Sequence, residues 1–168
     1  MVLLPLEQAD LPQFKADMQE AFQLGYEAEF GKSEEQILPE QDIDRSLGTD
    51  SAAAYKAVEN GQIVGGAIVQ IDPETQHNSL DFLYVKYGVQ SKGIGRAIWS
   101  ALEQQYPDTA VWHTCTPYFE KRNIHFYVNI CKFHIVEFLW EHHPSPDSPE
   151  DFIGDGGEGM FEFEKQMR

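Results

Sequence analysis

The sequence predicts an α/β protein built on one mixed sheet with helices on both of its faces. Two observations carry this prediction. Apolar residues change between strand-like and helix-like spacing along the chain, and the dipeptide Asn60-Gly61 marks a tight hairpin between two strand-like runs. Because strands and helices alternate in the chain, the helices are expected to pack on the sheet. With 168 residues, 42% of them hydrophobic, the chain is expected to form a single domain over residues 1–168.

Each element follows from the spacing of the apolar residues. Phe14 and Met18 lie on one face of a helix, as do Ile98 and Leu102, whereas Phe161 and Phe163 alternate with glutamates in a strand. About seven strands are expected, mostly antiparallel: 2–6, 54–59, 62–71, 80–85, 110–115, 134–140 and a closing strand at 161–163. The expected helices are 11–24, a short one within 37–47, 94–106 and 122–130.

The charge of the chain is unevenly distributed. Its 12 basic and 28 acidic residues give a net charge of −16. A chain this acidic is repelled by nucleic acids and by anionic membranes, so neither is an expected partner. Residues 86–132 nevertheless hold six basic and three acidic side chains, a local +3 against −19 for the remainder. This segment suits an anion and the remainder would attract cations, unless the acidity serves solubility alone.

Signals for targeting and for metal binding are missing from the sequence. The N-terminus has no basic stretch, and no apolar run reaches the roughly 20 residues of a membrane span, so a cytoplasmic protein is expected. Cys115 and Cys131 are too few for a disulfide framework. The six histidines show no ligand spacing, so no metal is expected.

A glycine-containing loop with basic residues joins a strand to a helix at residues 85–96. Gln90, Gly93 and Gly95 follow the strand that ends at Val85, and the helix begins at once. Amide groups at a helix N-terminus converge at the positive end of the helix dipole, where they can bind phosphate. Glycines let a phosphate approach the backbone closely. The alternative is a strand–helix turn whose glycines only ease the bend.

Two segments resemble the GNAT superfamily of acyl-CoA-dependent N-acyltransferases. Residues 90–95 read Gln-x-x-Gly-x-Gly, which is similar to the pyrophosphate-binding motif of that superfamily. Residues 123–127 read Asn-Ile-His-Phe-Tyr and residues 133–138 read Phe-His-Ile-Val-Glu-Phe, which resemble its later helix and strand. The order and spacing of the segments match over nearly the whole chain. The resemblance implies a GNAT-like fold and acetyl-CoA as cosubstrate.

The resemblance also implies which residues hold acetyl-CoA. Amides of the glycine-containing loop would bind the pyrophosphate, the backbone of Val85 would polarise the thioester carbonyl, and Asn123 would hydrogen-bond the cofactor. The implied cofactor-binding residues are Leu83, Tyr84, Val85, Gln90, Ser91, Lys92, Gly93, Ile94, Gly95, Arg96 and Asn123. One position departs from the superfamily pattern, because Lys132 stands where glycine is usual. A lysine there either makes the turn less left-handed or tolerates the strain.

Asp81 and Tyr127 are the implied catalytic residues. Asp81 lies four residues before Val85, where some members carry a catalytic glutamate, and strand alternation would put Asp81, Leu83 and Val85 on one face. Because aspartate is shorter than glutamate, Asp81 would act as base through a water. The alternative is that it caps the strand or pairs with a neighbour. Tyr127 would donate a proton to the leaving thiolate, unless it is a core aromatic residue.

The predicted function is transfer of an acetyl group from acetyl-CoA to a primary amine. Acidic segments at 27–50 and 141–158 correspond to connections that border the acceptor in the superfamily. This favours a cationic acceptor: a polyamine, an aminoglycoside-like amine or a peptide amine. The alternative is a non-catalytic acyl-CoA-binding sensor or partner-binding module. A homodimer is compatible with the sequence without being specified by it.

Overall fold

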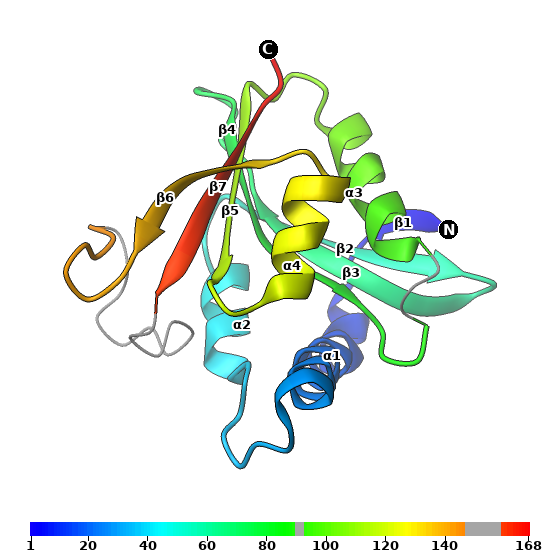
Figure 1. Cartoon of the computed structure of the whole chain (residues 1–168). Helices are drawn as coiled ribbons and strands as arrows, with labels where there is room; N and C mark the ends of the chain where they lie inside the picture. Colours follow the sequence, from blue (N-terminus) through cyan, green and yellow to red (C-terminus); the bar gives the residue numbers. More distant parts are fainter. Residues whose placement is uncertain (90–92, 147–158) are drawn as a thin grey trace. The chain divides into compact units, whose positions relative to one another are not determined.

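The computed structural model describes residues 1–89, 93–146 and 159–168, and these confirm the mixed sheet of seven strands. The strand order in the sheet is β1-β2-β3-β4-β5-β7-β6 (Figure 1). The strands are β1 (Val2–Pro5), β2 (Ala52–Glu59), β3 (Gln62–Gln70), β4 (His77–Val85), β5 (Val111–Pro117), β6 (His134–Leu139) and β7 (Met160–Gln166). The helices are α1 (Leu11–Phe30), α2 (Glu40–Leu47), α3 (Ile94–Gln105) and α4 (Lys121–His125), with a 3-10 turn η1 (Gln8–Asp10) and a π-helical turn η2 (Phe126–Ile130).

The described chain packs as two compact units, and β4 belongs to both. The first unit consists of Met1–Ile71 and Leu80–Pro107, the second of Asp72–Ser79 and Asp108–Arg168. Antiparallel ladders join β1 to β2, β2 to β3, β5 to β7 and β6 to β7. The start of β4 pairs with the start of β5 in parallel. The sheet is therefore mostly antiparallel, as predicted, whereas a single domain over 1–168 stays a prediction.

Helices cover both faces of β3 in the first unit. Gly65 and Gly66 are successive strand residues, so they face opposite sides of the sheet. A Cβ at Gly66 would lie 2.5 Å from Cε2 of Phe14 in α1, and one at Gly65 would lie 3.0 Å from Cδ1 of Ile98 in α3. Because the elements approach this closely, only glycine fits at both positions. The predicted placement of helices on both faces is confirmed.

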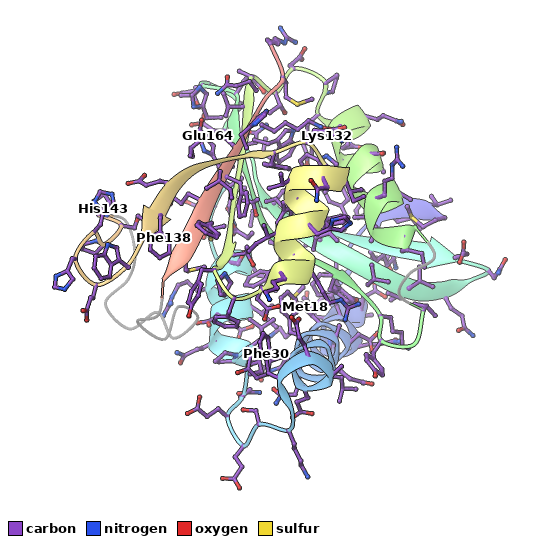
Figure 2. The ribbon with its side chains drawn as sticks, viewed as in Figure 1. Met18, Phe30, Lys132, Phe138, His143 and Glu164 are labelled. Carbon is purple, nitrogen blue, oxygen red and sulfur yellow. The ribbon has the colours of Figure 1, made fainter. Side chains whose placement is uncertain are left out.

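Helix α1 is longer than its apolar pattern predicts. The pattern fades after Leu24, yet the helix continues to Phe30 and ends where Gly31 adopts a φ of 89°. Tyr26 and Phe30, one turn apart, place their ring centroids 4.8 Å from each other, which helps to hold the added turn. Met18 is fully buried whereas Phe30 is exposed (Figure 2), so the last turn of α1 does not pack into the core.

Strand β4 begins three residues before its predicted start because its first residues are polar. Asn78 is fully buried and interrupts the apolar pattern. Its side-chain amide donates a hydrogen bond to Thr109 Oγ1 at 2.8 Å, and its Oδ1 accepts one from the backbone of Asp72 at 2.9 Å. A buried amide is tolerated in a strand when both ends are hydrogen-bonded. This pairing lies within the second unit.

The turn that follows η2 is left-handed at Lys132, which has a φ of 69°. This is the position where the resemblance led us to expect glycine. Lys132 Nζ donates a hydrogen bond to the carbonyl of Asn129 at 2.7 Å, which satisfies a carbonyl near the helix end. Of the two alternatives for this turn, the lysine therefore tolerates the strain, and the less left-handed turn is wrong.

Replacing Lys132 by glycine should stabilise the protein. Glycine removes about 1–2 kcal/mol of left-handed strain, offset in part by the lost side-chain hydrogen bond and by a freer unfolded chain, for a net gain of roughly 0.5–1 kcal/mol. Urea unfolding measures the difference. Lys121→Gly, at the start of α4, is the control and should be destabilised. A loss of stability in Lys132→Gly equal to that of the control would show that the turn carries no strain.

Candidate active site

Asp81 lies in β4 and is held by side chains from two other elements of the first unit. Ser46 Oγ, on α2, donates a hydrogen bond to Asp81 Oδ2 at 2.6 Å. Gln70 Nε2, at the end of β3, donates to the same oxygen at 2.7 Å. The candidate base therefore does pair with neighbouring side chains, as the alternative for this residue expected, and its carboxylate has a defined position.

The environment of Asp81 moves its pKa upward. Burial raises the pKa above its ordinary value, and the hydrogen bonds from Ser46 and Gln70 oppose this rise without cancelling it. The residue as a whole is exposed to water, although side chains of α2 and β3 contact its carboxylate. A general base works best when its pKa lies near the working pH, and the environment shifts Asp81 in that direction.

The prediction that Asp81 shares a face of β4 with Leu83 and Val85 is wrong. Phe82 and Tyr84 pack edge-on against phenylalanine rings of α1, with centroids 6.3 and 5.4 Å apart. Helices α1 and α2 share one hydrophobic cluster with Tyr84, and the Asp81 carboxylate bonds to α2. Two successive residues, Asp81 and Phe82, are thus directed to the same side. Such an interruption of strand alternation occurs at bulges and cannot be read from the apolar pattern.

Helix α3 is capped at its N-terminus by Gly93, which adopts a left-handed conformation with a φ of 74°. Its first hydrogen bond runs from the amide of Ala97 to the carbonyl of Gly93 at 3.0 Å. The amides of Ile94, Gly95 and Arg96 precede that bond and have no partner within the helix. A Cβ on Gly93 would meet nothing within 4 Å. The other predicted residues of this loop lie outside the described residues: Gln90, Ser91 and Lys92.

The side chain of Tyr84 belongs to the core of the first unit. The residue is 3% exposed, packs against Phe14, and its buried Oη has no hydrogen-bond partner among the described residues. Leu83 and Val85 are partly buried. Any contact of Tyr84 with a cofactor would therefore involve its backbone.

Tyr127 lies in η2, within an aromatic cluster of the second unit. Its ring centroid is 5.8 Å from that of Phe133 and 5.7 Å from that of Phe163, and the residue is 8% exposed. Burial raises the pKa of the phenol, and the hydrogen bond with Thr114 lowers it by less. The phenol is therefore protonated at neutral pH, as a proton donor requires, and the packing also fits a core aromatic residue.

Asn123 and Tyr127 are joined to β5 through two threonines. Asn123 Nδ2 donates a hydrogen bond to Thr116 Oγ1 at 3.3 Å, and Tyr127 hydrogen-bonds Thr114. Residues four apart on a helix and two apart on a strand each share a face, so the two pairs lie side by side. No motif singled out Thr114, Thr116, Ser46 or Gln70. The alternation of the two threonines on a strand is the one signal in the sequence that could have indicated a polar face.

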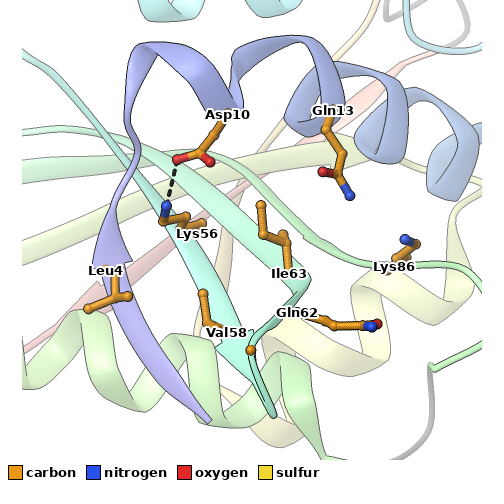
Figure 3. A pocket seen from close by; sticks show the side chains of 9 residues that line it. Leu4, Asp10, Gln13, Lys56, Val58, Gln62, Ile63 and Lys86 are labelled. Atoms are coloured by element: carbon orange, nitrogen blue, oxygen red, sulfur yellow. Dashed lines mark hydrogen bonds and ion pairs between the residues drawn. The ribbon is translucent and has the colours of Figure 1, made fainter.

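A pocket of about 550 Å³ lies elsewhere in the first unit (Figure 3). Its wall includes Leu4 and Ile63 together with Lys86 and the pair formed by Lys56 Nζ and Asp10 Oδ2, 2.6 Å apart. The carboxylate of Asp10 balances the charge of Lys56. None of the predicted catalytic or cofactor-binding residues lines this pocket.

The described ranges hold no group of three histidine, cysteine or acidic side chains placed to bind a metal ion. Within the same ranges, no helix is long and apolar enough to cross a membrane. Cys115 is exposed and Cys131 is buried, and no disulfide joins them.

A family model described as the acetyltransferase (GNAT) family matches residues 15–133, more than half of the chain. The chain belongs to this GNAT family. The matched range runs from α1 to Phe133 and includes Asp81, Gly93 and Tyr127. An uncharacterized protein of Bacillus subtilis (strain 168), YrkN, is 49% identical over 147 residues, which cover 86% of this chain and 80% of the relative.

Solved structures of GNAT proteins share the fold. The ribosomal-protein-S18-alanine N-acetyltransferase of Escherichia coli has a TM-score of 0.70 at 16% identity, covering 99% of this chain and 93% of that chain. A Bacillus subtilis acetyltransferase in complex with CoA has a TM-score of 0.68 at 14% identity, covering 98% and 97%. A GNAT acetyltransferase of Elizabethkingia anophelis with acetyl-CoA bound has a TM-score of 0.60 at 16% identity, covering 76% and 83%.

The raised pKa of Asp81 predicts how Asp81→Asn changes stability with pH. The folded state binds this proton more tightly than the unfolded state, so Asp81 lowers the stability of the wild type as pH rises above its ordinary pKa of 3.8. Asparagine does not titrate and keeps an oxygen for Ser46 and Gln70. The melting temperature of Asp81→Asn relative to wild type should therefore increase from pH 4 to pH 7.

Asp72→Asn is the matched control with the opposite sign. Hydrogen bonds from Thr75 and Glu74 lower the pKa of Asp72, so this carboxylate stabilises the fold above its ordinary pKa. The melting temperature of Asp72→Asn relative to wild type should decrease as pH rises. If the melting temperatures of both variants differed from that of wild type by a constant amount from pH 4 to pH 7, the environment assigned to Asp81 would be wrong.

Proposed function

We propose that this GNAT protein transfers the acetyl group of acetyl-CoA to a primary amine, with Asp81 as general base. A sensor that only bound acyl-CoA would need no base. The observation that carries the catalytic proposal is the position of Asp81, a water-exposed carboxylate with a raised pKa that is fixed by Ser46 and Gln70. Two structures of the same fold, which contain CoA and acetyl-CoA, support the choice of cosubstrate.

We assign the pyrophosphate of acetyl-CoA to the start of α3. The amides of Ile94, Gly95 and Arg96, which have no partner within the helix, lie at the positive end of the helix dipole, and Arg96 adds an exposed charge. Gly93 has no side chain in the approach to these amides, and a Cβ there would meet no atom within 4 Å from the described residues beyond its chain neighbours. Gln90, Ser91 and Lys92 would complete the loop, the backbone of residues 83–85 would bind the acyl end with Val85 at the thioester carbonyl, and Asn123 would bind the cofactor.

The proposed reaction is direct attack on the thioester by the amine nitrogen in its neutral form. As the nitrogen forms its bond to the carbonyl carbon, Asp81 takes the proton that the nitrogen loses, directly or through a water. The negative charge that develops on the carbonyl oxygen is stabilised by the backbone of Val85. The carbon–sulfur bond then breaks, and Tyr127 gives its phenolic proton to the CoA thiolate. Asp81 afterwards releases its proton to water, and Tyr127 takes one up from water. The products are an N-acetylated amine and CoA.

A cationic acceptor is supported by the acidity of the connection between α1 and α2. Glu34 and Glu35 are exposed there, and Glu29 is exposed in the last turn of α1. Against a chain charge of −16, a positively charged amine is attracted and an anionic one repelled. A polyamine, an aminoglycoside-like amine and a peptide amine all satisfy this requirement. The enzyme of E. coli with the same fold is named for a protein alanine.

An acceptor screen tests the proposed function. The full chain is incubated with acetyl-CoA and a panel of polyamines, aminoglycosides, peptides and anionic amino acids, and release of the CoA thiol is recorded. Thiol release that depends on a cationic amine supports the proposal. Binding of acetyl-CoA without thiol release over the whole panel would favour the sensor or partner-binding module.

Gly93→Asp should abolish acetyl-CoA binding, because it places a carboxylate beside the amides that hold the pyrophosphate. Gly93→Asn is a matched control, since asparagine has the same shape without the charge and tolerates a positive φ. Calorimetry should show a large loss of affinity for the aspartate variant and a smaller one for the asparagine variant. Equal affinities in the two folded variants would remove the start of α3 from the cofactor site.

Tyr127→Phe should lower turnover by roughly 10²-fold, the lower range for one general acid. Its acetyl-CoA affinity should stay nearly unchanged, because the ring still packs on Phe133 and Phe163. Steady-state thiol release gives the turnover, and Tyr118→Phe, an exposed tyrosine of the same unit, is the control. Wild-type turnover in Tyr127→Phe would leave this residue a packing role, with water as proton donor.

A further inference from the structure

The two oxygens of the Asp81 carboxylate have different environments. Ser46 Oγ and Gln70 Nε2 both donate to Oδ2, at 2.6 and 2.7 Å. No side chain in the described part of the chain donates to Oδ1. A carboxylate held through one oxygen keeps its orientation and still has lone pairs on the other oxygen for a proton.

Both donors are themselves fixed. Gln70 Nε2 also donates to the backbone carbonyl of Ser46 at 2.9 Å, and Gln70 Oε1 accepts a hydrogen bond from Ser51 Oγ at 2.7 Å. Ser46 is buried on α2 at 8% exposure. The amide of Gln70 cannot turn over without losing these bonds, because its oxygen would then face the Ser46 carbonyl and Asp81. Ser46, Gln70 and Ser51 therefore form a connected support for Asp81.

Hydrogen bonds, and not ion pairs, orient the carboxylate of Asp81 and oppose the rise in its pKa. The charged residues of α2 pair elsewhere: Arg45 lies 3.8 Å from Asp42, while Glu40 and Asp44 bind Lys15 of α1. Strand β3 contains no charged residue, and His77 is the one other ionisable side chain of β4 besides the tyrosine. Neutral donors orient a carboxylate while lowering its basicity less than a lysine or arginine partner would.

We propose that Ser46 and Gln70 are positioning residues that hold Asp81 through Oδ2 and leave Oδ1 as the atom that accepts the proton of the acceptor amine. This inference rests on the proposed function for the identity of the proton donor. In the step, a nitrogen–hydrogen bond breaks as the amine attacks the thioester, and an oxygen–hydrogen bond forms at Oδ1. The support also sets the pKa of the base, because each of its hydrogen bonds favours the ionised carboxylate.

The test compares Ser46→Ala with two variants of the same helix region. Ser46→Ala removes one donor to Oδ2, whereas Ser46→Thr keeps the hydroxyl. Thr49→Ala is the matched control, because its hydroxyl donates to the carbonyl of Arg45 and makes no contact with Asp81. Carbon-13 NMR of the Asp81 carboxyl, identified by its absence in Asp81→Asn, gives the pKa of this group in each full-length variant. The pH dependence of kcat/KM for a productive amine is measured in parallel.

We expect the pKa of Asp81 to rise in Ser46→Ala by about one pH unit, to return toward wild type in Ser46→Thr, and to stay unchanged in Thr49→Ala. The acidic limb of kcat/KM should move to higher pH by the same amount, so that activity on that limb falls about tenfold. Gln70→Leu should act in the same direction, since it removes the second donor.

An unchanged pKa in both Ser46→Ala and Gln70→Leu would overturn the positioning role. A pKa that rises while the acidic limb stays in place would overturn Oδ1 of Asp81 as the proton acceptor. Because the NMR titration needs no acceptor, a wild type without thiol release would contradict the proposed function and leave the positioning role to be decided by the titration alone.

Discussion

A single carboxylate oxygen, Oδ2 of Asp81, accepts hydrogen bonds from α2 and from β3 and thereby connects three elements of the first unit. A carboxylate enclosed by protein on one side loses hydration, and the two donors replace part of it. Without them the charge would be poorly compensated and its position undefined. The candidate site thus depends on this pair of hydrogen bonds. The same bonds also favour the interruption of strand alternation in β4 that directs Asp81 toward α2.

Close packing around β3 explains why such a contact can be maintained. Gly65 and Gly66 allow α3 and α1 to approach the strand from opposite sides, with too little room for a side chain at either position. Gln70, at the C-terminal end of the same strand, forms a hydrogen bond with the backbone of Ser46 in α2. The second unit contains a similar arrangement, in which Thr114 and Thr116 of β5 form hydrogen bonds with Tyr127 and Asn123. In both units, polar residues on a strand orient the residues to which we assign chemistry.

Much of the fold could be predicted from the sequence. The hairpin at Asn60-Gly61, helix α3 and the closing strand follow from local spacing, and the GNAT family follows from two short motifs. The early start of β4 was missed because the buried Asn78, whose partner Thr109 is distant in sequence, interrupts the apolar pattern. The extension of α1 to Phe30 was missed because the apolar pattern of the helix fades after Leu24. The π-helical turn of η2 was missed for a related reason, since its hydrogen-bond period has no signature in residue type.

The residues of the candidate site likewise include some that the sequence predicts and some that it does not. Asp81 and Tyr127 were found through their places in motifs, whereas Ser46 and Gln70 were not, because they approach Asp81 across 35 and 11 residues of sequence. The orientation of Asp81 was predicted incorrectly, since a regular strand was assumed. A residue type and a spacing identify a candidate base, but only its hydrogen-bond donors show which oxygen remains to take a proton.

The most direct test of the central claim is the rate of CoA thiol release by Asp81→Asn at saturating acetyl-CoA, with an amine that wild type accepts. If Asp81 is the general base, kcat/KM for the amine should fall by about 10²-fold or more, while the dissociation constant of acetyl-CoA stays the same. The asparagine keeps an oxygen for Ser46 and Gln70, so the loss would be one of basicity. A variant with the wild-type rate would contradict the account and leave Asp81 a structural residue.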